Sequence, residues 1–196
     1  MVFFVRVCDG CGRRVASACA GCKDGMEAVG RPLVEGVHVG LVYEGLVKRF
    51  IIGLKYRNHR DNVRILVDAL LRRVGPLPEV DVITWVPTTR RRVRHRGIDH
   101  AELLARRLGR RLGVPVRACL VKTSSEPQTG RTRRQRLTGP TFVTRSLRKG
   151  VRVMVVDDVV TTGTSLDRAR TALLASGASS VVLVAVAATP APNSRG

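Results

Sequence analysis

The sequence has few aromatic residues and no long hydrophobic run. Aromatic side chains make up 4% of the 196 residues, so no platform for stacking the bases of a single strand is visible. The longest apolar run, residues 181–188, has the length of a strand, whereas a membrane helix needs about 20 apolar residues. A hydrophobic fraction of 44% still provides for a folded core, which argues against a wholly disordered chain.

Two further signals are missing. Residues 1–6 form too short a stretch for a signal peptide and lack its basic start. No G-x-x-x-x-G-K-[ST] pattern occurs, which excludes a Walker-type phosphate loop. We therefore expect a soluble, cytoplasmic protein without membrane insertion.

Acidic residues are also scarce. The chain has 35 basic and 15 acidic residues, a formal net charge of +20, and 30 of the basic residues are arginine. The planar guanidinium group presents a fork of donors that suits phosphate oxygens. Such a charge indicates a polyanionic partner, either nucleic acid or a pyrophosphate-bearing substrate. A genome biased toward arginine codons is the alternative explanation.

Four of the five cysteines form two C-x-x-C pairs with seven residues between them: Cys8, Cys11, Cys19 and Cys22. Four thiolates make a closed tetrahedral Zn²⁺ site with no open position for catalysis. Because so small a segment can bury little apolar surface, the bound metal would supply the free energy for its folding. Two disulfides or free thiols are the alternatives, and a cytoplasmic location disfavours disulfides. Cys119 is expected to pack at a strand end.

Hydrophobic periodicity predicts an α/β domain. Apolar strands alternate with amphipathic helices, which favours a parallel sheet buried on both faces. Asp99 is expected to cap a helix, with Glu102 at the capping-box position. The predicted strands are residues 37–43, 80–86, 151–156 and 180–187, and the predicted helices are 45–56, 60–74, 99–112 and 165–176. We expect a zinc knuckle at 1–30 with a linker at 25–32, a main domain at 31–190, and a disordered tail at 191–196.

The most specific pattern is D-D-V-V-T-T-G-T-S at 157–165. Asp157 and Asp158 follow an apolar strand, at the end where α/β sheets bind ligands. Carboxylates suit a sugar diol or its bound Mg²⁺. Backbone N–H groups, hydroxyls and a helix N-terminus suit a phosphate, and the residues that offer them are Thr161, Thr162, Gly163, Thr164 and Ser165. An ordinary strand and turn with solvated acids is the alternative.

This segment resembles the phosphoribosyl pyrophosphate (PRPP) motif of type I phosphoribosyltransferases. The resemblance implies a parallel sheet with flanking helices and a mobile hood loop. It also implies Asp157 and Asp158 at the ribose 2- and 3-hydroxyls, residues 161–165 around the 5-phosphate, and Mg²⁺ bound with PRPP.

Further segments resemble the ComF-type, or GntX-like, family of these enzymes. They are the cysteine knuckle, V-P-T-T-R at 86–90, R-G at 96–97, E-L-L-A at 102–105, P-Q at 127–128 and the PRPP motif. The resemblance implies a pyrophosphate loop of Thr88, Thr89, Arg90 and Arg96, with Arg90 in a catalytic role beside the two acids. It also implies uptake of transforming DNA as the biological setting.

Residues 122–140 are polar, basic and aperiodic, and are predicted to form a lid over the reaction, with Gln128 and Arg136 matching the family. A surface loop is the alternative there, and a solvated basic turn is the alternative for Arg91, Arg92 and Arg94. The family usually has R-G-F-N-Q where this chain has R-G-I-D-H, ending in Asp99 and His100, and an Asn where this chain has Gly139. These departures bear on the acceptor substrate and on catalytic competence.

Three functions are consistent with these patterns. The first is a phosphoribosyltransferase that releases pyrophosphate from PRPP. The second is a non-catalytic PRPP-binding accessory protein of DNA uptake, which would work with the helicase machinery. The third is a protein that binds single-stranded DNA through its arginine clusters. Homo-oligomers are compatible with each of them.

Overall fold

The computed structural model describes residues 6–15, 19–28, 30, 32–88, 98–123, 141–145 and 147–190. Several predicted features lie outside these residues: Thr89, Arg90, Arg91, Arg92, Arg94, Arg96, Gln128, Arg136, Gly139 and the tail 191–196. Within the described ranges, no helix combines the length and the apolar composition needed to cross a membrane.

The chain divides into two compact units. One comprises Met1–Leu77, Asp158–Thr161 and Ala185–Gly196, and the other comprises Pro78–Asp157 and Thr162–Val184. Strands β7 (Arg152–Val160) and β8 (Ser180–Ala188) contribute residues to both units. They belong to a four-stranded sheet with the order β3-β8-β7-β4.

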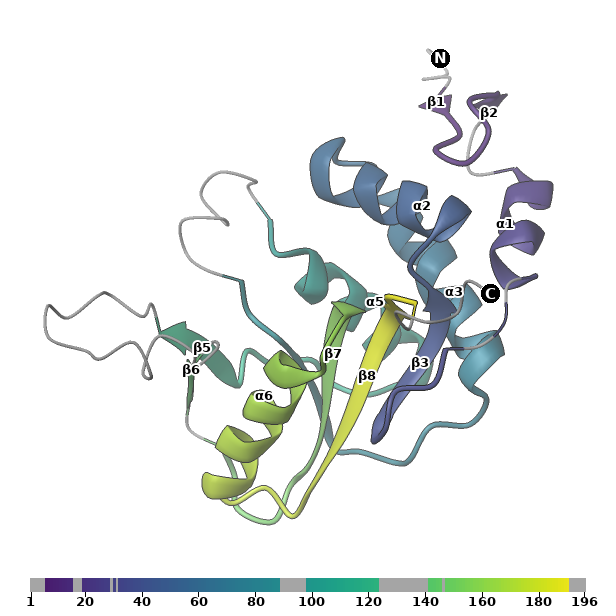
Figure 1. Ribbon diagram of the computed structural model, residues 1–196. Helices are drawn as coiled ribbons and strands as arrows, with labels where there is room; N and C mark the ends of the chain where they lie inside the picture. The colour runs from purple at the N-terminus through teal and green to yellow at the C-terminus, as the bar shows by residue number, and fades with distance from the viewer. Residues whose placement is uncertain are drawn as a thin grey trace, which may run out of the picture. The chain divides into compact units, whose positions relative to one another are not determined.

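The first unit is built around helix α3 (Asp61–Val74), which packs on strand β3 (Val37–Val42) and against α1 (Ala20–Glu27) and α2 (Gly45–Tyr56) (Figure 1). The short strands β1 (Arg6–Val7) and β2 (Arg14–Val15) form an antiparallel pair that belongs to the same unit. Fully buried apolar side chains fill its interior, among them Phe50, Ile51, Leu66 and Leu70.

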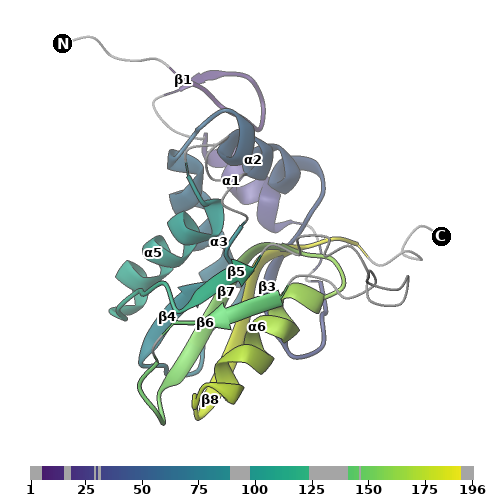
Figure 2. The same cartoon turned by 90° about the vertical axis from the view of Figure 1, so that its left-hand side faces the viewer.

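The second unit contains strand β4 (Val82–Trp85), which pairs in parallel with β7 from Val82↔Val153 to Trp85↔Val156. Helix α5 (His100–Leu112) packs on β4. Strands β5 (Leu120–Thr123) and β6 (Thr141–Thr144) form an antiparallel pair, and helix α6 (Thr164–Ala175) packs against β6 (Figure 2). The core of this unit includes Ile83, Leu104, Leu108 and Met154.

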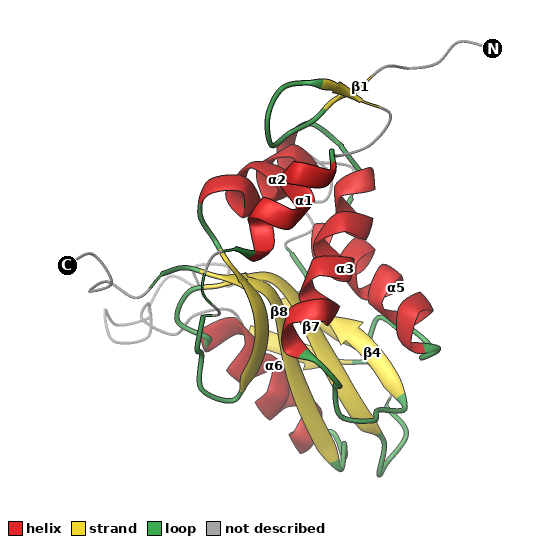
Figure 3. Cartoon of the chain, turned by 90° about the vertical axis from the view of Figure 1, so that its right-hand side faces the viewer, coloured by secondary structure: helices red, strands yellow, loops and turns green. Residues whose placement is uncertain are grey.

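Hydrogen bonds align the carboxyl ends of three strands within the first unit. The Tyr43 N–H, just after β3, donates to the Ala188 carbonyl of β8 at 2.7 Å, and the Thr189 N–H, just after β8, donates to the Val160 carbonyl of β7 at 3.0 Å. Figure 3 shows β7 and β8 side by side as strands. Together with the parallel pairing of β4 and β7, these bonds confirm the predicted parallel sheet.

Some predicted elements were wrong in extent. Strand β7 continues to Val160, because its last carbonyl still bonds to Thr189, so Asp157 and Asp158 lie within the strand and not beyond it. Helix α1 runs to Glu27, with Met26 buried, so the linker expected from residue 25 begins later.

The pair of strands β5 and β6 was not predicted. Residues 122 and 123, expected at the start of the lid, are the last residues of β5 and pair with Phe142 and Thr141 of β6. Cys119, expected at a strand end, is buried directly before β5, and its N–H donates to the Thr84 hydroxyl at 3.2 Å.

Asp99 caps α5, as predicted, but not as part of a capping box. Its carboxylate accepts from the Ala101 N–H at 3.2 Å and from the Thr88 N–H at 2.9 Å. Glu102 instead forms an ion pair with Arg106 one turn later, at 2.8 Å. Burial raises the pKa of Asp99, and the hydrogen bonds from Thr88, Ala101 and Trp85 only partly offset this effect.

We expect Asp99→Ala to lower the free energy of unfolding by about 1–3 kcal/mol, because it removes a cap and leaves the Thr88 N–H without its acceptor. Since the folded state raises the pKa of Asp99, its stabilising contribution is largest below the unfolded-state pKa and falls as pH rises through the folded-state pKa. Urea unfolding between about pH 4 and about pH 7 should therefore show a deficit that shrinks with rising pH. A deficit that grows with pH would contradict this sign.

Candidate functional site

The segment 157–165 forms the end of β7, a short turn and the start of α6. Asp157 and Asp158 are half-buried, whereas Thr161, Thr162 and Thr164 are exposed. Gly163 is the N-cap of α6 and has φ 75°, in the left-handed region that favours glycine. The hydroxyl-bearing side chains are therefore open to solvent at the start of a helix.

The first turn of α6, in the second unit, is well ordered by its own hydrogen bonds. The Gly163 carbonyl accepts from the Asp167 N–H at 3.0 Å, and the hydroxyls of Thr162 and Thr164 lie 2.9 Å apart in a hydrogen bond. Free N–H groups of a first helical turn and neighbouring hydroxyls are the donors that phosphate-binding loops use. This turn thus has the chemistry of an anion site.

In the first unit, Asp158 has a partner that no sequence motif identifies. The ammonium of Lys55, in the last turn of α2, lies 2.7 Å from Asp158 Oδ2, and the two side chains are 19% and 17% exposed. Sequence reasoning missed Lys55 because the pair joins residues far apart in the chain. The one available signal was a lysine within the apolar helical stretch that the sequence predicts at 45–56.

Among the residues expected at the pyrophosphate, the structure describes Thr88 alone. Its N–H donates a hydrogen bond to the carboxylate of Asp99. Asp99 and His100, which differ from the ComF-type pattern that the sequence resembles, are 9% and 8% exposed, so both are buried where α5 begins. The carboxylate of Asp99 therefore links the start of α5 to Thr88 and is not exposed to solvent.

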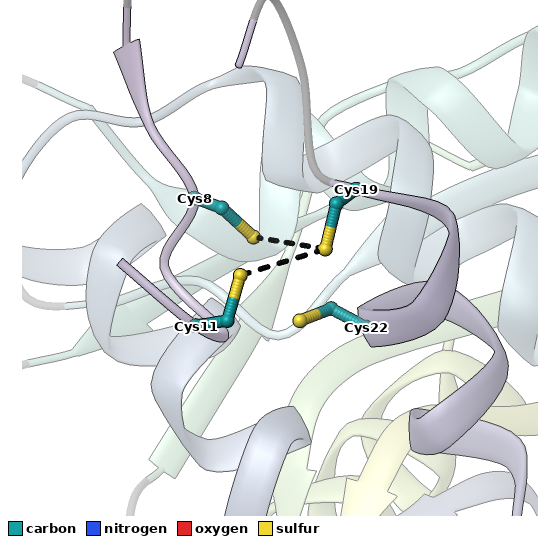
Figure 4. A group of neighbouring side chains, drawn as sticks. All are labelled: Cys8, Cys11, Cys19 and Cys22. Carbon is teal, nitrogen blue, oxygen red and sulfur yellow. Dashed lines mark hydrogen bonds between the residues drawn. The ribbon is translucent and has the colours of Figure 1, made fainter. Parts of the chain in front are cut away.

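The four knuckle cysteines converge on one point (Figure 4). All their sulfur atoms lie within 4.8 Å of one another, with Cys8 Sγ 4.0 Å and Cys11 Sγ 3.5 Å from Cys19 Sγ. Zn–S bonds of about 2.3 Å in a tetrahedron would set sulfur atoms about 3.8 Å apart. All five cysteines of the chain are described and all are free, which contradicts the alternative of two disulfides. The donor set therefore fits a structural zinc ion.

Hydrogen bonds, one of them from a charged side chain, lower the pKa of two of these thiols. The guanidinium of Arg13 donates to Cys11 Sγ at 3.4 Å and lowers the pKa of Cys11 to about 6. Burial works against ionisation of Cys8, but backbone N–H groups outweigh it and lower its pKa. Burial raises the pKa of Cys22, so this thiol needs the metal itself to release its proton.

Asp9, between Cys8 and Cys11, joins the knuckle to the helices of the first unit. Its side chain is 3% exposed and accepts hydrogen bonds from Asn62 Nδ2 at 2.6 Å and from Arg57 Nη1 at 3.4 Å, with His59 Nδ1 at 2.8 Å. A Cβ on Gly53 would collide with the Asp9 carboxylate and lie 2.8 Å from Asn62 Nδ2. Glycine at position 53 thus permits the close approach of the knuckle to α2.

The comparisons with known families match residues 93–195 to the model described as "Phosphoribosyl transferase domain". The match covers more than half of the chain and includes the whole segment 157–165. The chain belongs to this family, and its fold is that of a type I phosphoribosyltransferase, with a parallel sheet flanked by helices. A comparison with curated proteins finds no match.

Three solved structures illustrate the similarity. A glutamine PRPP amidotransferase from B. subtilis, complexed with ADP and GMP, is 23% identical (TM-score 0.44), and the match covers 63% of this chain and 25% of that one. A purine phosphoribosyltransferase from Pyrococcus horikoshii is 20% identical (TM-score 0.41), and the match covers 79% of this chain and 80% of that one. An orotate phosphoribosyltransferase from Aeropyrum pernix is 21% identical (TM-score 0.42), and the match covers 72% of this chain and 76% of that one. This chain thus spans about a quarter of the length of the amidotransferase.

We expect the purified protein to contain about one zinc ion per chain, measured by atomic emission, because four thiolates close the coordination sphere. Cys8→Ser should abolish stoichiometric zinc and lower the thermal midpoint, since metal binding contributes to folding. Cys119→Ser is the matched control, because Cys119 is free and buried beside β5, and it should leave the zinc content unchanged. Full zinc content in Cys8→Ser would count against the site.

Gly53→Ala should destabilise the protein by about 1–3 kcal/mol, because the added methyl overlaps the buried carboxylate of Asp9. Gly21→Ala is the control: Gly21 lies in α1, and an added Cβ meets no atom within 4 Å. Alanine there should be neutral or slightly stabilising, since it is the better helix former. Equal urea midpoints for Gly53→Ala and the unmodified protein would contradict the packing of Asp9 against α2.

Proposed function

We propose that this protein is a PRPP-binding phosphoribosyltransferase of the ComF type. It transfers a 5-phosphoribosyl group to an acceptor and releases pyrophosphate. The observation that carries the proposal is the segment 157–165, in which two carboxylates of a sheet strand precede an exposed, hydroxyl-rich turn at the start of α6. The family match over this segment supports it.

Each part of the segment has a role in this proposal. Asp157 and Asp158 accept hydrogen bonds from the ribose 2- and 3-hydroxyls. Residues 161–165 hold the 5-phosphate with N–H groups and hydroxyls, and the left-handed Gly163 turns the backbone around it. Thr88, Thr89, Arg90 and Arg96 hold the pyrophosphate, and Gln128 and Arg136 belong to a lid that excludes water.

The reaction breaks the bond between ribose C1 and the pyrophosphate oxygen and forms a bond from C1 to the acceptor nucleophile. Positive charge develops on the sugar and negative charge on the leaving group, so cationic side chains at the pyrophosphate stabilise the transition state. Mg²⁺ bound with PRPP would neutralise further negative charge on the leaving pyrophosphate. Exclusion of water by the lid protects PRPP from hydrolysis.

The ComF assignment is supported by the order of its parts along the chain. The four cysteines, whose sulfur atoms converge, precede the family match at residues 93–195, and we assign a knuckle to residues 1–30 and the transferase domain to 31–190. On this assignment the protein acts in the cytoplasm, in the uptake of transforming DNA.

The second candidate is a PRPP-binding or single-stranded-DNA-binding accessory protein without transferase activity. The net charge of +20 favours it, as do the arginines of α5 at positions 106, 107, 110 and 111, three of which are exposed. Binding to DNA through such a face would weaken steeply with salt, because each phosphate contact releases a counterion. DNA binding that ignores salt would count against the DNA-binding form of this candidate.

We expect titration calorimetry with Mg²⁺–PRPP to show binding, and Asp157→Asn/Asp158→Asn to weaken it at least about tenfold through lost charge-assisted hydrogen bonds. Asp81→Asn is the matched control, since its exposed carboxylate bonds to Arg152 at the start of β7. Pyrophosphate release with a panel of nucleobases separates an enzyme from a binding protein. Absence of heat with the unmodified protein would end the proposal.

A further inference from the structure

The ion pair of Lys55 with Asp158 brings a cationic group from outside the PRPP motif to one of its two acids. The distance of 2.7 Å is that of a charge-assisted hydrogen bond. About four-fifths of each side chain is withdrawn from solvent, so the pair is screened less than a surface pair. Lys55 therefore acts on both the orientation and the charge of Asp158.

The charge matters because of what the segment is proposed to bind. Asp157 and Asp158 are adjacent carboxylates, and a sugar carrying a 5-phosphate and a pyrophosphate is itself strongly anionic. Without a nearby cation, the two acids would repel the ligand whose hydroxyl groups they accept. The ammonium of Lys55, 2.7 Å from Asp158 Oδ2, offsets one of these negative charges.

The backbone that carries Lys55 is held firmly. Lys55 lies in α2 between Gly53, which packs on the Asp9 carboxylate, and Arg57, which donates to that carboxylate. Arg49, earlier in α2, donates to the Gly10 carbonyl of the knuckle at 2.7 Å. The knuckle thus contacts α2 on both sides of the turn that presents Lys55, all within the first unit.

We propose that Lys55 is a positioning residue for sugar-phosphate binding, which holds Asp158 as an oriented, charge-compensated acceptor, and that the zinc knuckle braces the helix that carries it. This inference rests on the proposed function of the segment 157–165. It assigns a role to a residue outside the motif, and it gives the knuckle a purpose in ligand binding beyond its own folding.

The test compares Lys55→Met, Lys55→Arg and Lys48→Met by calorimetry with Mg²⁺–PRPP. Lys55→Met should weaken binding about tenfold, whereas Lys55→Arg should restore most of the affinity because it keeps the charge. Lys48→Met is the matched control, since Lys48 is an exposed lysine of the same helix, and it should bind as the unmodified protein does. Thermal midpoints within about 2 °C of one another would show that all variants fold.

A second measurement separates charge from packing. Mg²⁺ alone should bind Lys55→Met more tightly than the unmodified protein, because the ammonium no longer competes for the carboxylate of Asp158. Loss of packing alone would not raise the Mg²⁺ affinity. Equal Mg²⁺ affinities in the two proteins would overturn the positioning role.

The outcomes also distinguish the two proposals. If the unmodified protein binds PRPP and Lys55→Met binds it equally well, the proposed function stands and the role of Lys55 is wrong. If the unmodified protein binds no PRPP, the proposed function fails, and the sugar-phosphate role of Lys55 fails with it. The Mg²⁺ titration then still reports whether Lys55 compensates the charge of Asp158.

Discussion

The structure depends on strand β7, whose side chains change from apolar to acidic while the strand is still part of the sheet. Val153, Met154, Val155 and Val156 are buried, and the next two residues are carboxylates that are still part of the strand. A strand covered on both faces tolerates polar side chains only where its cover ends. The cover ends only locally at Asp157 and Asp158, which are half-buried, because Val160 at the end of the strand is buried again.

The turn from β7 to α6 combines two requirements on the backbone. The chain must reverse within three residues, and the first turn of α6 must keep N–H groups available. Gly163 meets the first requirement with its left-handed conformation. Exposed threonines on either side meet the second, because their short side chains leave the backbone accessible. The same few residues thus serve both the fold and the proposed phosphate site.

The knuckle shows how a small segment is fastened to a larger one through a buried polar group. Asp9 sits between two zinc-ligand candidates and is satisfied by donors from the residues that follow α2 and from α3. A buried carboxylate is tolerated only with such partners. The contact fixes the orientation of the knuckle relative to α2, which apolar packing alone would specify less well.

The sequence by itself determined the elements whose signals are local. The period of apolar residues located α2 and α3 closely, the C-x-x-C spacing identified the four cysteines whose sulfur atoms converge, and the acidic pair with its threonine-rich turn marked the segment 157–165. Tertiary structure alone decided the pairing of β5 with β6, the extension of β7 to Val160, the use of Asp99 to hold Thr88, and the pairing of Lys55 with Asp158. These features rest on partners distant in the chain, and a hydrogen bond or ion pair between distant residues leaves no periodic trace in the sequence, so it forms only once the fold brings its two groups together.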